Sequence, residues 1–226
     1  MIISFSGLDG AGKTTQIKML LAEYRNQGAK VGSIYSIFPD IRYHDERELL
    51  SAYNKLQSCD VILLRYRLNS DKNNAIMHKL ESLPLPLPEL ASQAALQGFH
   101  DHLELDRNII EPLVERGKTI IFDRYFYDEL AFKYIFGCPE SVLNMLYADA
   151  RAADVGFYIH IPAEECLNRN RMRPDGTVNI YKEKKHVIDL IYRFNDIAER
   201  KKLVVLNGTK TRETIKTEIL SALSFS

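Results

Sequence analysis

Three features are missing from this sequence of 226 residues: long apolar runs, a disulfide framework and an excess of charge of either sign. No stretch approaches the ~18 consecutive apolar residues of a membrane-spanning helix, so no such helix is expected. The cysteines, Cys59, Cys138 and Cys166, are odd in number and far apart, which argues against a disulfide framework and against closely spaced metal ligands. We expect free thiols in a reducing cytoplasm.

The charges balance, because Lys plus Arg and Asp plus Glu each number 30. A neutral total gives no general attraction for a nucleic acid polymer or an anionic membrane, so neither is an expected partner. Any anion site must instead be a local cluster of basic groups. The first residues, MIISFSG, lack the basic region of a signal peptide, and a cytoplasmic protein is expected.

Apolar strand-like segments alternate with helical patterns along the chain. The strands carry apolar residues without strict alternation, which is typical of a parallel sheet buried on both faces. We therefore predict one α/β domain over residues 1–226, with a doubly wound, five-stranded parallel sheet and helices on both faces. The predicted strands are 2–7, 30–36, 118–122, 155–161 and 202–206. The predicted helices are 13–27, 89–116, segments within 127–151, the start of 163–173, 181–200 and 211–223.

The segment at about 45–88 is the hardest to interpret. It is predicted to hold one or two helices, with the apolar run CDVILL (59–64) between them. The alternating prolines of LPLPLP (83–88) exclude a helix interior. A rigid connector into the next helix is favoured over a proline-rich ligand for a partner protein.

Residues 7–14, GLDGAGKT, fit the phosphate-binding pattern G-x-x-x-x-G-K-[ST] between a strand and a helix, as in P-loop NTPases. Glycines let backbone N–H groups surround a phosphate chain, and the helix adds its positive end. Lys13 can reach the β- and γ-phosphates, and the Thr14 hydroxyl can bind Mg²⁺. The expected ATP-binding residues are Gly7, Gly10, Ala11, Gly12, Lys13, Thr14 and Thr15.

Asp123 and Arg124 follow the third predicted strand. Ligands of parallel sheets bind beyond the carboxyl ends of the strands. The carboxylate of Asp123 could hold Mg²⁺, and the guanidinium of Arg124 could bind a phosphate. A structural ion pair or a helix cap is the alternative, but the nearby P-loop favours a functional pair.

Three arginines alternate in NRNRMRPDG (168–176), namely Arg169, Arg171 and Arg173. Cations so close together repel one another unless an anion joins them. We predict a lid at about 166–182 whose arginines, like Lys13 and Arg124, act in catalysis by neutralising charge on the transferred phosphate. A solvated helix end is the alternative.

Four stretches, in order along nearly the whole chain, resemble the thymidylate kinase family of P-loop nucleoside monophosphate kinases. These stretches are GLDGAGKTTQ (7–16), RNIIEPLVERGKTIIFDRY (107–125), FYIHIPAEECLNRNRMR (157–173) and DLIYRFNDIAER (189–200). The resemblance implies transfer of the γ-phosphate of ATP–Mg²⁺ to a nucleoside 5′-monophosphate such as dTMP. It also implies a homodimer.

The resemblance further implies a role for individual residues. Gly10 stands where some relatives carry a catalytic arginine, so the lid arginines would supply that charge. Asp123 and Thr14 would hold the metal. The implied acceptor-binding residues are Asp9, Phe38, Arg42, Phe99, His102, Arg124 and Tyr125.

The chain departs from the family pattern where the thymine base is read. Relatives carry an aromatic residue and then an arginine four positions later, where this chain has Gly98 and His102, with Phe99 one step away. Asp128 replaces the usual serine three residues after the tyrosine of the Asp-Arg-Tyr motif. Two other functions therefore stay open: a kinase for another small acceptor, such as a sugar or secondary metabolite, and a non-catalytic nucleotide-binding regulator.

Overall fold

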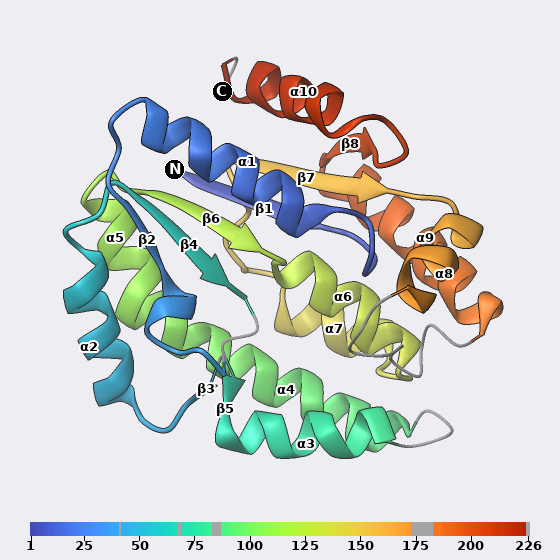
Figure 1. Cartoon of the computed structure of the whole chain (residues 1–226). Coiled ribbons are helices and arrows are strands. Elements are labelled where there is room, and N and C mark those ends of the chain that lie inside the picture. Colours follow the sequence, from blue (N-terminus) through green and yellow to red (C-terminus); the bar gives the residue numbers. More distant parts are fainter. Residues whose placement is uncertain (41, 67–68, 83–86, 173–182, 225–226) are drawn as a thin grey trace.

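A six-stranded parallel sheet organises the molecule (Figure 1). The computed structural model describes residues 1–40, 42–66, 69–82, 87–172 and 183–224. Every strand pairing in this sheet is parallel, as expected for an α/β fold with the strands buried between helices. In spatial order the strands are β2 (Val31–Ser33), β4 (Val61–Arg65), β6 (Thr119–Asp123), β1 (Ile2–Ser6), β7 (Val155–His160) and β8 (Val204–Asn207).

Helices cover both faces of the sheet (Figure 1). On one face α1 (Lys13–Asn26) packs beside α10 (Arg212–Ser224). On the other face α5 (Glu111–Glu115) contacts β6, and α9 (Lys184–Arg200) contacts β7. None of the described helices is long and apolar enough to cross a membrane. Because helices cover both faces of a parallel sheet, the predicted doubly wound architecture is confirmed.

The predicted number of strands was wrong, because the apolar run at 59–64 contributes a sixth strand. Residues Val61–Arg65 form β4, which pairs with β2 on one side and β6 on the other. A short apolar run does not distinguish a buried strand from a buried helix by its periodicity. Only pairing with two strands that are distant in sequence decides between them.

The rest of the 45–88 segment forms a small unit against the central helix. It contains α2 (Glu46–Leu56), β5 (Asn69–Ser70) and α3 (Asp71–Ser82). β5 pairs with β3 (Arg42–Tyr43) in a separate two-stranded sheet. α3 packs along α4 (Pro88–Leu105) (Figure 1). Of the predicted proline-rich connector, residues 83–86 lie outside the described part of the chain.

The predicted long helix at 89–116 is present but locally widened. After α4 comes a π-helical turn at Asp106–Ile110, and then α5, which contains Pro112. Proline lacks an N–H group and its ring clashes with the carbonyl group four residues earlier, so a wider turn accommodates it. Gly117 ends the helix with φ +71°, and its N–H donates to the carbonyl of Val114.

The remaining helices lie beside the carboxyl ends of the strands. They are α6 (Phe126–Ile135), α7 (Glu140–Leu146) and α8 (Ala163–Arg171). Every residue of β1 is buried, as is every residue of β7 except His160, and Phe5 of β1 stacks on Phe157 of β7 with 5.1 Å between the ring centroids. This rigid sheet holds the loops that follow its strands, where the predicted site residues lie.

Candidate active site

The P-loop joins β1 to α1 in a conformation that requires glycine. A Cβ atom on Gly7 would lie 2.6 Å from the carbonyl oxygen of Ile159, a contact that backbone atoms cannot relieve cheaply. Gly12 is the N-cap of α1 with φ +99°, in the left-handed region. The predicted turn between strand and helix is therefore present, with the amino end of α1 facing it.

Lys13 is folded back onto the P-loop. Its Nζ donates to the carbonyl oxygens of Gly7 and Leu8, each at 2.8 Å. Burial, followed by the nearby Arg124 cation, lowers the pKa of Lys13 to about 8. A buried cation held by two weak carbonyl acceptors can exchange them for phosphate oxygens, because an anion compensates its charge better.

Arg124 follows β6 at the carboxyl edge of the sheet. Its φ is +70°, an uncommon value for a residue other than glycine and one that is concentrated at functional sites. NH1 donates to Asp128 Oδ1 at 2.8 Å, and NH2 donates to Asp9 Oδ1. Arg124 thus links the P-loop to the start of α6 through two carboxylates. One of them belongs to Asp128, which stands where the family pattern has serine.

A cavity of about 330 Å³ lies between the P-loop and the ends of β4 and β6. It brings together both predicted metal-binding residues and the predicted ATP-binding residues other than Gly7 and Ala11. It also adds Arg65, which the sequence analysis did not identify. Arg65 directly follows the apolar run at 59–64, so the sequence would have indicated this residue if the run had been recognised as a strand. The cavity is lined by Asp9, Gly10, Gly12, Lys13, Thr14, Thr15, Arg65, Asp123 and Arg124.

Arg169 of α8 contacts the P-loop from the side of β8. NH1 donates to the Gly10 carbonyl at 3.0 Å, NH2 to the Gly208 carbonyl at 3.1 Å, and Nε to Glu165 Oε1 at 2.6 Å. A Cβ atom on Gly10 would lie 3.2 Å from Cβ of Arg169, so glycine lets α8 approach closely. Asn170, also on α8, donates to the carbonyl of Asp9 at 2.9 Å.

Neither Arg169 nor Arg171, the two lid arginines within the described residues, lines the cavity itself. Arg171 is exposed at the end of α8. Arg173 lies outside the described residues, as does most of the predicted lid. Of the three arginines, only Arg169 is seen in contact with the P-loop.

The predicted acceptor residues other than Asp9 and Arg124 do not line this cavity. Phe38 and Tyr125 are buried in the core, and Arg42 is exposed on β3. Phe99 is half-buried against Tyr147. The fifth of these residues, His102, is buried too.

His102 is enclosed by aromatic rings. The ring of Tyr66, from the 45–88 segment, lies 4.7 Å from that of His102 between centroids. Burial lowers the pKa of His102 to about 4, and the charge of Glu129 opposes that shift. The histidine is therefore neutral at physiological pH and is packed as a core residue.

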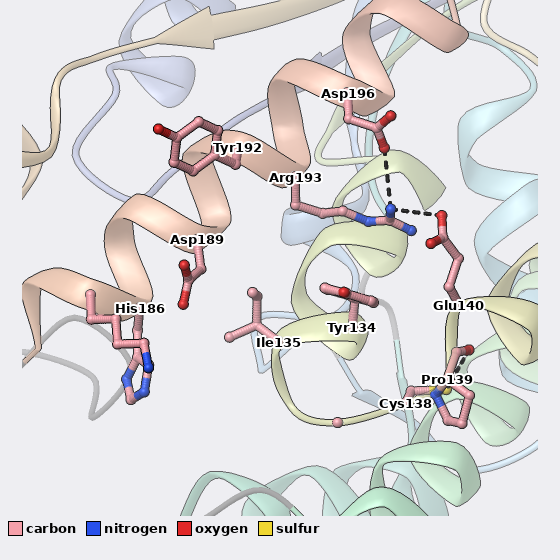
Figure 2. Close-up of a pocket in the computed structure, with 12 residues that line it drawn as sticks. Tyr134, Ile135, Cys138, Pro139, Glu140, His186, Asp189, Tyr192, Arg193 and Asp196 are labelled. Carbon is pink, nitrogen blue, oxygen red and sulfur yellow. Dashed lines mark hydrogen bonds and ion pairs between the residues drawn. The ribbon is translucent and has the colours of Figure 1, made fainter.

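A second cavity, of about 900 Å³, lies between the end of α6, the start of α7 and the outer face of α9. Figure 2 shows Arg193 of α9 extending between Asp196 and Glu140, with distances of 3.2 and 2.7 Å from NH1. The ring of Tyr134 lies 4.6 Å from its guanidinium carbon. Acidic groups already neutralise this arginine, and the cavity does not include the P-loop.

Comparisons with known proteins agree with the motifs. The thymidylate kinase family model matches residues 86–219, more than half of the chain. Thymidylate kinase of Fervidobacterium nodosum is 25% identical over 99% of this chain and 98% of its own. That of Thermosipho africanus is 26% identical over 98% and 96%, and that of Chlorobium luteolum is 30% identical over 75% and 66%. The chain belongs to the thymidylate kinase family of nucleoside monophosphate kinases.

Proposed function

We propose that this chain transfers the γ-phosphate of ATP to the 5′-phosphate of dTMP in the cavity beside the P-loop. The observation that carries the proposal is the convergence of Lys13, Arg124 and Asp9 on one cavity at the carboxyl edge of the sheet. An oxygen of the acceptor phosphate attacks the γ-phosphorus, and the bond from that phosphorus to the bridging oxygen of ADP breaks. Such a transfer needs positioning and charge neutralisation rather than a covalent nucleophile on the protein.

The donor phosphates would bind along the P-loop. The N–H groups at the start of α1 face the loop, and the Lys13 ammonium lies on its inner side. Arg169 closes the opposite side through the carbonyls of Gly10 and Gly208. With Arg171 and Arg173, it would belong to a lid that excludes water.

Magnesium fits the oxygen ligands available at this cavity. The Thr14 hydroxyl and the Asp123 carboxylate both line it, and Mg²⁺ prefers such hard oxygen donors, with water completing its coordination. When bound, the ion would neutralise charge on the phosphates. Asp123 is oriented by Tyr35, whose hydroxyl donates to Oδ2 at 3.1 Å.

On the acceptor side, Asp9 and Arg124 would meet the incoming nucleotide. The relatives named thymidylate kinase support dTMP as the acceptor, whereas the base-reading positions Gly98 and His102 differ from the family pattern. The comparisons do not favour a sugar kinase or a non-catalytic regulator. A homodimer, as the resemblance implies, remains part of this proposal.

A panel of acceptors tests the function. Purified protein with ATP–Mg²⁺ is assayed for ADP release with dTMP, dUMP, dCMP, UMP and unphosphorylated sugars. We expect dTMP to give the highest kcat/KM. Turnover of a sugar alone would support the second function, and the absence of ATP consumption with every acceptor would support a regulator.

Two lysines of α1 provide the matched variants for this assay. Lys13→Ala removes the buried cation at the phosphates and should lower kcat by about 100-fold or more. Lys18→Ala, at an exposed position of the same helix, should leave kcat unchanged. Equal effects of both substitutions would contradict the role assigned to Lys13.

A further inference from the structure

The sixth strand of the sheet brings an additional arginine to the active site. β4 arises from the 45–88 segment and lies between β2 and β6. Its last residue, Arg65, is in register with Asp123, the last residue of β6. Both residues line the cavity with Lys13 and Thr14. The 45–88 segment, whose role the motifs did not indicate, therefore places a cation at the phosphate site.

Arg65 has hydrogen-bonding capacity to spare. It is half-buried, and its Nε is buried without a hydrogen-bond partner among the described residues. The side chain interacts with the Tyr35 hydroxyl, which donates to Asp123. No ion pair joins Arg65 to a carboxylate in the described part of the chain. A guanidinium carries five N–H donors, and a phosphate oxygen is a strong acceptor for them.

Arg124 differs from Arg65 in this respect. Its guanidinium already donates to Asp9 and Asp128 and reaches the carbonyl of Gly7 at 3.4 Å. Two carboxylates compensate its single positive charge. A phosphate that approaches Arg124 must compete with these acceptors, whereas a phosphate that approaches Arg65 meets no such competitor among the described carboxylates.

The strand order indicates which phosphate Arg65 would meet. β4 lies two strands from β1 on the side of β6, where Asp123 and Arg124 follow the sheet. β8 lies two strands from β1 on the opposite side, and Gly208, which follows β8, binds Arg169 there. Arg65 is thus on the Arg124 side of the P-loop, to which the proposed function assigns the acceptor.

We propose that Arg65 binds the 5′-phosphate of the nucleoside monophosphate acceptor and shares this task with Arg124. The assignment rests on the proposed function, because that function identifies the acceptor side. Arg65 would hold a phosphate oxygen and lower the charge repulsion between the acceptor and the γ-phosphate. The inserted strand then contributes directly to substrate binding rather than only to the width of the sheet.

Equilibrium binding of dTMP and of thymidine, both without ATP, tests the assignment. Arg65→Gln should weaken dTMP binding by about 10- to 100-fold, the value of a charge-assisted hydrogen bond, and should leave thymidine binding unchanged. Arg65→Lys should restore part of the dTMP affinity. Arg47→Gln, at an exposed arginine of the same segment, should change neither affinity. In steady-state assays, Arg65→Gln should raise the KM of dTMP but not that of ATP.

Other outcomes would contradict either the role of Arg65 or the proposed function. Unchanged dTMP affinity, an equal loss for dTMP and thymidine, or a rise in the KM of ATP alone would overturn the role of Arg65. If the wild-type protein binds dTMP but transfers no phosphate to it, the proposed function fails and the ratio of dissociation constants still decides the role of Arg65. If the wild-type protein binds no nucleoside monophosphate, both fail.

Discussion

At the scale of single residues, partners decide what each charged or polar group can do. Arg124 and Arg65 both line the cavity, yet the first is compensated by Asp9 and Asp128, whereas the buried Nε of the second has no hydrogen-bond partner within the described part of the chain. Lys13 donates to two loop carbonyls, and its pKa is lowered to about 8. Residue type alone does not distinguish these states, since all three side chains are basic.

His102 should make the stability of the protein depend on pH. Its pKa is about 4 in the folded protein, below the ordinary 6.5, because burial disfavours the charged form. The unfolded chain therefore takes up the proton first on acidification. The stabilisation is complete above pH 6.5 and is lost as the pH falls towards 4, by up to about 1.4 kcal/mol per pH unit.

Urea unfolding at a series of pH values measures this dependence. His102→Gln should remove this component, so its free energy of unfolding should fall less steeply than that of the wild type between pH 6.5 and 4. His100→Gln, at an exposed histidine two residues away on the same helix, should follow the wild type. Parallel curves for wild type and His102→Gln would show that His102 does not titrate as a buried group.

At the scale of elements, the ends of strands and the starts of helices create the site. The carboxyl ends of β1, β4 and β6 supply the P-loop, Arg65 and Asp123. Because the strands are parallel and in register, these ends meet at one edge of the sheet. Some glycines are required because another segment lies too close for a Cβ atom, whereas other glycines have room for one.

Two glycines should respond in opposite ways to substitution by alanine. A Cβ on Gly98 of α4 would meet Asn73 and Glu129 at 3.6 Å, an ordinary contact, so Gly98→Ala should stabilise the fold by about 0.5–1 kcal/mol through helix propensity. A Cβ on Gly208 would lie 2.7 and 2.8 Å from the methyl groups of Ile161 and Ile159 and 3.1 Å from the P-loop carbonyl of Ala11. Gly208→Ala should therefore destabilise it by about 1–3 kcal/mol.

Chemical denaturation of both alanine variants beside the wild type measures these changes. An unchanged m-value would show that the difference reflects the native state. Destabilisation by Gly98→Ala would mean that the 45–88 segment packs more tightly on α4 than the distances indicate. A neutral Gly208→Ala would show that the loop after β8 can shift without cost.

At the scale of the whole molecule, one hydrophobic core underlies both faces of the six-stranded sheet. β1 and β6 each have a strand on both sides, whereas β3 and β5 form an isolated pair of two-residue strands. Local opening costs least where few buried contacts and few neighbouring strands must be disrupted. Stability should therefore vary strongly from the centre of the sheet to the β3–β5 pair.

Amide hydrogen exchange followed by mass spectrometry should reveal this gradient. Peptides that cover β1 and β6 should exchange only through global unfolding, and peptides that cover β3 and β5 should exchange through local opening. We expect the free energies of opening to differ by about 3 kcal/mol or more. Equal protection of the two groups would show that the β3–β5 pair unfolds together with the six-stranded sheet.

Much of this protein could be predicted from local sequence. The P-loop is defined by glycines and a lysine at fixed spacing, and the Asp-Arg pair follows an apolar strand. Buried parallel strands carry continuous apolar runs, so the α/β architecture follows from their alternation with helices. These features depend on neighbours in sequence, and the sequence by itself determined them.

The tertiary structure decided what depends on distant partners. The run at 59–64 became a strand only because β2 and β6 lie on both sides of it, and this pairing brought Arg65 beside Asp123. His102 and Tyr125, expected at the acceptor, are buried together with Tyr66 because α4, α6 and the 45–88 segment pack around them. Burial and strand pairing depend on contacts between segments far apart in the chain, so no local sequence pattern predicts them.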